Sequence, residues 1–189
     1  MLKLHIVIAS TRPGRMGPVI GKWFHEFAMG HGKFEVELVD LADPQLPLMD
    51  EPAHPRLQQY EHQHTRDWSA RVEAADAFVF VTPEYNYSSP PALMNALDYL
   101  YKEWNYKPVG FVSYGGLSGG IRSVQMTKQI VTTLKMVPLV EAVHIPFFSQ
   151  HIDDTGVFTP NELHQKSAAD MLDELLRWAE ALKPLRAGS

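Results

Sequence analysis

The sequence predicts an α/β protein built on one doubly wound parallel sheet. Five short apolar runs alternate with five segments whose apolar residues recur at helical spacing. The chain has 189 residues, enough to bury one full central sheet. Because no repeat, linker or low-complexity tract divides it, we expect a single domain over residues 1–185 and a short C-terminal tail over 186–189.

The N-terminal half is expected to alternate strand, helix, strand, helix and strand, over residues 3–9, 18–29, 34–41, 57–74 and 76–81. The first strand is apolar, and the helix after it ends at two glycines. The second strand alternates acidic and apolar residues, which predicts a half-exposed edge strand. A proline-rich loop follows it and is long enough to cover a site. The second helix is polar, and the third strand is apolar throughout, as in a strand buried on both faces.

The C-terminal half is expected to alternate helix and strand, over residues 90–100, 107–114, 121–136, 137–145 and 161–183. The first of these helices has prolines only at its start. The last is amphipathic, with Thr159 as its expected N-cap and Glu162 as the capping-box partner. Strands separated by helices give a parallel sheet through right-handed crossovers. For five strands the expected arrangement is the flavodoxin-like order 2-1-3-4-5.

Composition narrows the possible functions. The net charge is −5 and the basic residues are scattered, which argues against nucleic acid or an anionic membrane as the main partner. The N-terminus does not resemble a signal peptide and no run of about eighteen apolar residues occurs, so we expect a cytoplasmic protein. The absence of cysteine excludes thiol chemistry, so any redox function must use a bound cofactor. His62 and His64 would diverge on a helix, and no metal site is expected.

Three loops should share one edge of this sheet, because strands 1, 3 and 4 are neighbours in the expected order. They are residues 10–17, 82–90 and 114–120. The first offers the hydroxyls of Ser10 and Thr11 and two arginines at a helix start, which suits a phosphate better than it suits a plain turn. It matches neither G-x-G-x-x-G nor GxxxxGK[ST], so a single terminal phosphate is expected.

The second and third loops suit a flat heterocycle. Backbone amides from Glu84 to Tyr87 could bind acceptor atoms along one edge of such a ring, with Tyr85 or Tyr87 packing beside it. The third loop begins Tyr-Gly-Gly and leaves space for a planar group. A phosphate at one end and a flat ring at the other describe flavin mononucleotide (FMN).

Several segments resemble the NADPH-dependent FMN reductases of the flavodoxin-like fold. They are ASTRPGR after the first strand, LPLMDE after the second, PEYNYSSPPALMNALDYL after the third and Tyr-Gly-Gly after the fourth, together spanning roughly residues 3–145. The resemblance implies a bound FMN, NADPH or NADH as electron donor, and a flavin, quinone, azo compound or similar small molecule as acceptor. It also implies a homodimer or homotetramer, and the aromatic cluster of Tyr99, Tyr101, Trp104 and Tyr106 would suit the subunit interface.

The same resemblance implies which residues hold the cofactor. Around the phosphate it places Ser10, Thr11, Arg12, Arg15, Gly17, Pro18 and Val19. Along the ring edge it places Pro83, Glu84, Tyr85, Asn86 and Tyr87, and at the end of the ring site Tyr114, Gly115 and Gly116. No catalytic side chain is expected, because hydride passes to the cofactor and the protein supplies positioning and electrostatics.

Two alternatives remain open at this point. Residues 116–120 match the G-x-S-x-G motif of a nucleophile elbow, with Ser118 as nucleophile, Asp153 or Asp154 as the acid and His164 as the base of a serine hydrolase. A hydrolase would leave the first and second loops unexplained and would have its His164 inside a helix. The other alternative is a flavodoxin-type electron carrier without turnover of its own.

Overall fold

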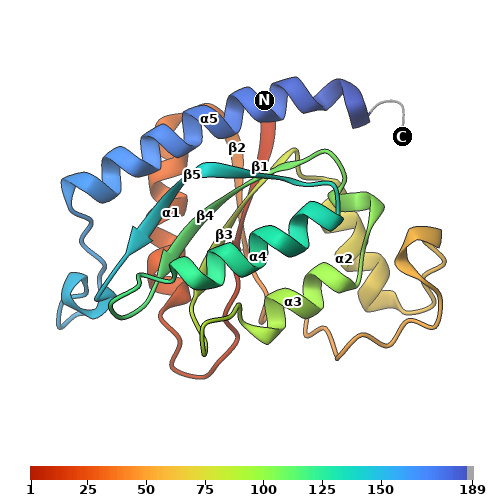
Figure 1. The fold of residues 1–189 in the computed structure, drawn as a ribbon, viewed down its shortest axis with the longest axis horizontal. Helices are drawn as coiled ribbons and strands as arrows, with labels where there is room; N and C mark the ends of the chain where they lie inside the picture. The colour runs from red at the N-terminus through yellow and green to blue at the C-terminus, as the bar shows by residue number, and fades with distance from the viewer. Residues whose placement is uncertain (187–189) are drawn as a thin grey trace.

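The computed structural model describes residues 1–186, and they form a five-stranded parallel sheet in the order β2-β1-β3-β4-β5 (Figure 1). The predicted order is confirmed. The strands are β1 (Leu2–Ile8), β2 (Phe34–Asp40), β3 (Ala77–Pro83), β4 (Pro108–Tyr114) and β5 (Val137–Ile145). Every residue of β3 and β4 is buried, whereas β2 alternates buried and exposed residues at the edge of the sheet.

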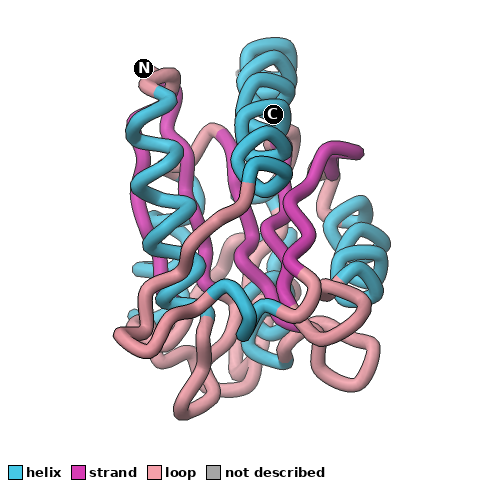
Figure 2. The backbone as a smooth tube through the Cα atoms, turned by 90° about the vertical axis from the view of Figure 1, so that its left-hand side faces the viewer, coloured by secondary structure: helices cyan, strands magenta, loops and turns pink. Residues whose placement is uncertain are grey.

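Helices cover both faces of the sheet (Figure 1). They are α1 (Gly17–His31), α2 (Gln63–Glu73), α3 (Pro91–Asp98), α4 (Ile121–Thr133) and α5 (Glu162–Arg186). One core cluster joins the sheet to α2, α3 and α4 through side chains such as Trp68 and Leu97, and the other joins it to α1 and α5 through Phe24 and Leu172. Figure 2 shows the strands between these layers, with most loops gathered at the edge opposite the N-terminus.

The start of α2 corrects the prediction of one helix over residues 57–74. The chain makes only a short 3-10 turn at Pro55–Leu57, and α2 itself begins at Gln63. Gln58 lies between them in the left-handed region, with φ 53°, where a regular helix cannot continue. The guanidinium of Arg66 donates to the carbonyls of Tyr60 and Glu61 and fixes the intervening bend.

The ends of α5 also differ from the prediction. Asn161, not Thr159, precedes the first helical residue, and its side-chain oxygen accepts from the amide of His164 at 2.9 Å. The Nδ1 atom of His164 accepts in return from the amide of Asn161 at 3.3 Å. Histidine here takes the place that Glu or Gln usually has in a capping box. At the other end Arg186, predicted to lie in the tail, belongs to the helix, while residues 187–189 lie outside the described residues.

The aromatic cluster proposed for a subunit interface is split by the fold. Tyr99 and Trp104 are at most 1% exposed and belong to the core between the sheet and α2 to α4, so this half of the prediction is wrong. Tyr101 and Tyr106 remain half-buried at the surface. Among the helices within residues 1–186, none is long and apolar enough to cross a membrane.

Candidate active site

The three loops identified in the sequence meet at the carboxyl edge of the sheet. The hydroxyls of Ser10, in the first loop, and Tyr85, in the second, are hydrogen-bonded at 2.5 Å. Gly17, at the end of the first loop, packs so closely on the third that an added Cβ would lie 3.1 Å from the hydroxyl of Tyr114. The loops follow strands β1, β3 and β4, which are adjacent, and ligands of open α/β sheets bind in this position.

The first loop presents backbone amides without partners. Within residues 1–186, the amides of Thr11, Arg12, Gly14 and Met16 donate no hydrogen bond, while that of Arg15 donates to the carbonyl of Arg12. No side chain caps the start of α1, and its first turn holds no acidic residue. Free amides and the positive end of the helix dipole together favour an anion here.

The two arginines of this loop have different surroundings. Arg15 is ion-paired with Asp40 at 2.5 Å, and both side chains are less than 20% exposed. Arg12 is exposed, lies 5.8 Å from the centre of the Tyr85 ring, and forms no ion pair within the described part of the chain. The Nε atom of Arg15 is buried without an acceptor. Arg12 therefore has its whole guanidinium available for a ligand, whereas Arg15 fixes the loop to β2 and has only its Nε donor unused.

The second loop folds into a two-residue hairpin. Tyr85 and Ser88 exchange backbone hydrogen bonds of 3.0 and 2.9 Å. Asn86 and Tyr87 between them have φ values of 51° and 69°, the combination that a type I′ turn requires. A tyrosine rarely adopts this backbone conformation, and such outliers gather at ligand sites. The amides of Asn86 and Tyr87 donate no hydrogen bond within residues 1–186.

The side chain of Glu84 contacts the third loop and the start of α4. Its carboxylate accepts hydrogen bonds from Ser118 at 3.0 Å and from Arg122 Nε at 2.6 Å. Burial alone would raise the pKa of Glu84, but these hydrogen bonds outweigh burial and hold the pKa below its usual range. The guanidinium of Arg122 also lies 3.8 Å from the centre of the Tyr87 ring. Sequence reasoning missed Arg122, although a lone arginine at the start of the helix after a glycine loop was a visible signal.

A buried set of hydroxyls supports the second loop from below. Ser89 and Thr127 are hydrogen-bonded to each other, and Thr127 donates to the carbonyl of Ser123 at 2.8 Å. Thr82, at the end of β3, lies 3.3 Å from the Ser123 hydroxyl. These contacts join the second loop to α4 through buried side chains, in addition to the pair of Glu84 and Arg122.

The third loop presents exposed glycine backbone at the sheet edge, while its tyrosine ring is buried. The side chain of Tyr114 is only 3% exposed and packs on Phe148, with ring centres 5.4 Å apart, and burial raises the pKa of its hydroxyl. Gly116, by contrast, is exposed, and an added Cβ would have no atom within 4 Å. Of the three residues predicted here, only Gly116 leaves open space. An added Cβ at Gly115 would lie 3.2 Å from the backbone nitrogen of Gly120, so Gly115 packs against the end of its own loop, and Tyr114 is buried.

Pro18, Val19 and Pro83 lie at the margin of the site. Pro83 is buried at the end of β3. Pro18 and Val19 line a cavity of about 370 Å³ beside Trp23 and Val157, on the flank of α1. They belong to the first turn of α1 and line this separate cavity.

The geometry contradicts the serine hydrolase alternative. Ser118 Oγ donates to Glu84 and accepts from Arg122 at 3.1 Å, and no histidine within residues 1–186 bonds to it. His164 serves the cap of α5 instead, and Asp153 accepts from residues of its own turn. The proposed triad is not assembled.

The prediction that the side chains of His62 and His64 point in different directions is wrong. His62 precedes α2, and its ring stacks on that of His64 with centres 5.1 Å apart. His64 Nε2 lies 3.0 Å from an Asp50 carboxylate oxygen, while His62 Nε2 is 4.0 Å from the other. The described residues hold no group of three or more His, Cys, Asp or Glu arranged to bind a metal ion.

These loops fit the two ends of FMN. Unpaired amides, Arg12 and the uncapped start of α1 suit the phosphate. The outward amides of the Asn86-Tyr87 turn suit the acceptor atoms of a ring edge, and Gly116 leaves room for a flat group beside them. The donor set is right for a phosphorylated flavin, and no side chain acting as nucleophile is required.

Comparison with known proteins identifies the family of this chain. The family model for the NADPH-dependent FMN reductases matches residues 2–150. The chain is 41% identical over 148 residues to an NAD(P)H-dependent FMN reductase of Schizosaccharomyces pombe, covering 76% of this chain and 74% of that protein. It is 34% identical over 112 residues to an NAD(P)H:quinone oxidoreductase of Solanum tuberosum, covering 54% and 56%.

The fold has a close counterpart among solved structures. The flavoenzyme FerB of Paracoccus denitrificans, an NAD(P)H:(acceptor) oxidoreductase, superposes with a TM-score of 0.74 at 22% identity, covering 96% of this chain and 98% of FerB. At that identity the likeness shows the fold alone, and the sequence matches carry the assignment. This chain belongs to the family of NADPH-dependent FMN reductases, oxidoreductases that use FMN and NAD(P)H.

Proposed function

We propose that FMN binds in the crevice where the three loops meet, with its phosphate at the first loop and its ring between the second and third. The observation that carries this is the Ser10–Tyr85 hydrogen bond of 2.5 Å, which joins the phosphate loop to the ring loop. The residues assigned to the phosphate are Ser10, Thr11, Arg12, Arg15, Gly17, Pro18 and Val19. Those assigned to the ring are Pro83, Glu84, Tyr85, Asn86, Tyr87, Tyr114, Gly115 and Gly116.

Within these assignments the residues act in three ways. The first-loop amides and Arg12 bind the anion directly, while Arg15 keeps the loop in place through Asp40. Asn86 and Tyr87 donate their amides to the ring edge, where such donors stabilise negative charge that develops on reduction. Glu84 holds the hairpin by way of Arg122. FMN supplies the hydride acceptor, so this chain's own work is binding, orientation and electrostatics.

The acceptor is proposed to be a flavin, a quinone, an azo compound or a similar small molecule, as the name of the potato relative suggests for quinones.

We further propose a homodimer or homotetramer working in the cytoplasm, where NAD(P)H is supplied. Leu117, Ile121, Met126 and Phe147 are between 42% and 82% exposed next to the crevice, and a subunit contact would cover them. A monomeric mass in light scattering at micromolar concentration would contradict the oligomer.

The phosphate assignment can be tested by comparing FMN with riboflavin, which lacks the phosphate. In Arg12→Ala, we expect the dissociation constant of FMN to rise about tenfold to a hundredfold, as for a lost charge-assisted hydrogen bond. Riboflavin affinity should not change. Quenching of flavin fluorescence measures both constants, and Arg177→Ala, an exposed arginine on α5, is the matched control.

Two results would contradict the assignment. One is equal weakening of FMN and riboflavin in Arg12→Ala, which would place the arginine at the ring. The other is an unchanged FMN affinity in both variants. Steady-state oxidation of NADPH by the FMN-loaded protein, with a quinone as acceptor, tests the activity independently of the residue assignment.

A further inference from the structure

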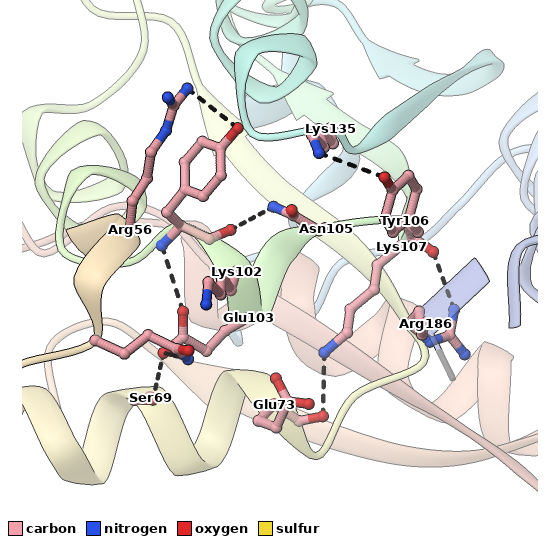
Figure 3. A pocket seen from close by; sticks show the side chains of 12 residues that line it. Arg56, Ser69, Glu73, Lys102, Glu103, Asn105, Tyr106, Lys107, Lys135 and Arg186 are labelled. Atoms are coloured by element: carbon pink, nitrogen blue, oxygen red, sulfur yellow. Dashed lines mark hydrogen bonds between the residues drawn. The ribbon is translucent and has the colours of Figure 1, made fainter. Parts of the chain in front are cut away.

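A second cavity lies at the amino edge of the sheet, opposite the crevice. Its volume is about 650 Å³, within the range of pockets that hold small organic molecules. Its walls come from the end of α2, from residues 101–107, from Lys135 after α4 and from Arg186 at the end of α5. Figure 3 shows Lys107 and Arg186 on one side of this cavity, Lys135 and Tyr106 above them, and Arg56 across from them.

The walls are rich in positive charge, although the chain carries a net charge of −5. Five cationic side chains line the cavity, and only two carboxylates, those of Glu73 and Glu103, do so. The cations are Arg56, Lys102, Lys107, Lys135 and Arg186. Arg186 is ion-paired with Asp76 at 2.7 Å. The other four form no ion pair with a carboxylate anywhere in residues 1–186, so their charge is directed at the cavity without a protein counter-ion.

One of these cations is buried. Lys107 is 2% exposed, and its Nζ donates to the carbonyls of Val72 at 2.9 Å and Glu73 at 3.1 Å. An ammonium group can donate three hydrogen bonds, so one donor remains without a partner among the described residues. Burial lowers the pKa of Lys107 to about 8, against the smaller opposing effect of Glu73. A buried ammonium without a counter-ion is costly, and a bound anion would remove that cost.

The carboxylate of Glu103 does not fill this need. It is 1% exposed and accepts from the hydroxyl of Tyr60 at 2.8 Å, from the hydroxyl of Ser69 at 2.6 Å and from the side-chain amide of Gln58 at 3.2 Å. Neutral donors thus surround it on the α2 side of the cavity. All three donors meet Oε1, while Oε2 accepts from the backbone amide of Tyr101 at 3.3 Å, and no lysine within residues 1–186 donates to either oxygen.

Two tyrosines hold two of the remaining cations on their ring faces. The guanidinium of Arg56 lies 4.5 Å from the centre of the Tyr101 ring, and the ammonium of Lys135 lies 5.3 Å from that of Tyr106. Each cation also donates to the hydroxyl of a tyrosine, at 3.3 and 3.4 Å. The aromatic faces hold the two side chains over the opening without neutralising them, since a ring carries no net charge.

We propose that this cavity is a binding site for a phosphorylated small molecule, distinct from the flavin crevice. Four cations without carboxylate partners suit a group with more than one negative charge, and a guanidinium with several ammonium groups is the usual set for phosphates. The volume leaves room for an organic part beside the phosphates. β4 separates the two sites: Lys107 precedes its first residue and Tyr114 is its last, which puts them about 20 Å apart.

The test measures pyrophosphate binding to the FMN-loaded protein by isothermal titration calorimetry, so that the flavin crevice is already filled. We expect one site per chain. Arg56→Ala combined with Lys135→Ala should weaken binding at least about tenfold, and Lys107→Met should do the same. The control is Lys166→Ala, an exposed lysine near the opposite end of α5, about 30 Å from Arg186 along the helix. Its affinity should equal that of the parent protein.

Specific phosphate binding can be distinguished from general attraction of anions to positive charge. Failure to bind pyrophosphate at millimolar concentration would overturn the proposal, as would equal affinity in the double variant and the parent. Tricarballylate, a tricarboxylate of similar charge, should bind more weakly, and tighter binding than pyrophosphate would overturn the phosphate class. Arg56 and Lys135 are exposed, so their variants should fold even if Lys107→Met does not. Flavin absorbance reports separately whether the crevice is intact.

Discussion

Glu84, which the sequence predicts at the cofactor site, has a structural role in the fold. The family resemblance puts it along the ring edge, whereas the structure turns its carboxylate to Ser118 and Arg122. Its lowered pKa means that the folded state binds the ionised form better than the unfolded chain does. The stability that this carboxylate contributes is therefore complete above the unfolded pKa, about 4.3, and is lost as the pH falls from there through the folded value.

Glu84→Gln should accordingly lower the free energy of unfolding at pH 7, and the difference from the parent should shrink as the pH is lowered below about 4.3. Urea unfolding followed by circular dichroism measures both. A double-mutant cycle with Arg122→Gln should give a larger coupling than the same cycle on the exposed pair Lys166–Asp170. A difference that is constant from pH 7 to pH 3 would contradict this account.

The sequence could not separate the roles of Arg12 and Arg15, because they stand three residues apart in one loop. What separates them is Asp40, which lies 25 residues from Arg15 and ends β2. The register of β1 against β2, with Ile8 beside Asp40, brings that carboxylate to the first loop. The strand order places the end of β2 beside the end of β1, so the acidic residue Asp40 at that end could have been predicted to lie next to the first loop.

At the scale of elements, the turn before α4 depends on Gly120. The sequence shows a glycine there but not whether the fold requires one. Gly120 has φ 83°, and an added Cβ would lie 2.9 Å from Ser113 Cβ and 3.0 Å from the backbone nitrogen and oxygen of Tyr114. The chain needs a residue without a side chain here to bring α4 against the end of β4. Gly120 is thus a packing requirement, whereas Gly116 in the same loop has open space around an added Cβ.

Gly120→Ala should destabilise the protein by about 1–3 kcal/mol, the usual cost of forcing a side chain into this backbone region, and more if β4 has to shift. Gly30→Ala is the matched control: it lies within α1, has ordinary backbone angles and has no atom within 4 Å of an added Cβ. That change should stabilise by about 0.5–1 kcal/mol. Thermal unfolding of both variants measures the contrast, and equal effects would show that the turn tolerates a side chain.

For the whole molecule, the strand order could be predicted because five strands that alternate with helices favour the order 2-1-3-4-5. The burial patterns agree with it: the apolar strand β3 is buried throughout at the centre of the sheet, and Phe34–Asp40 lies at the edge. The start of α2 and the N-cap of α5 could not be predicted, because each depends on a single residue. Gln58 adopts a left-handed backbone that interrupts the expected helix, and Asn161 rather than Thr159 caps α5. The cationic cavity at the amino edge was not predicted at all, because its walls come from segments far apart in the sequence.

The molecule as a whole should lose stability as the solution is acidified from neutral pH. Burial lowers the pKa of His5, His144 and His164 below the ordinary value of 6.5, although Glu37 opposes the effect at His5. Each therefore binds a proton more readily in the unfolded chain. Their contribution to stability is complete above pH 6.5 and declines as the pH falls from there toward the folded values, with a slope of at most about 1.4 kcal/mol per pH unit for each histidine.

His164 allows this to be tested without losing the helix cap. In His164→Gln, the side-chain oxygen can still accept from the amide of Asn161, as in an ordinary capping box, but it no longer titrates. The free energy of unfolding should then fall less steeply between pH 7.5 and 5 than in the parent, when urea unfolding is measured for both at one FMN concentration. Parallel curves would mean that protonation of His164 is not coupled to unfolding, and the acid sensitivity would then lie with His5 and His144, where burial acts within and beside the sheet itself.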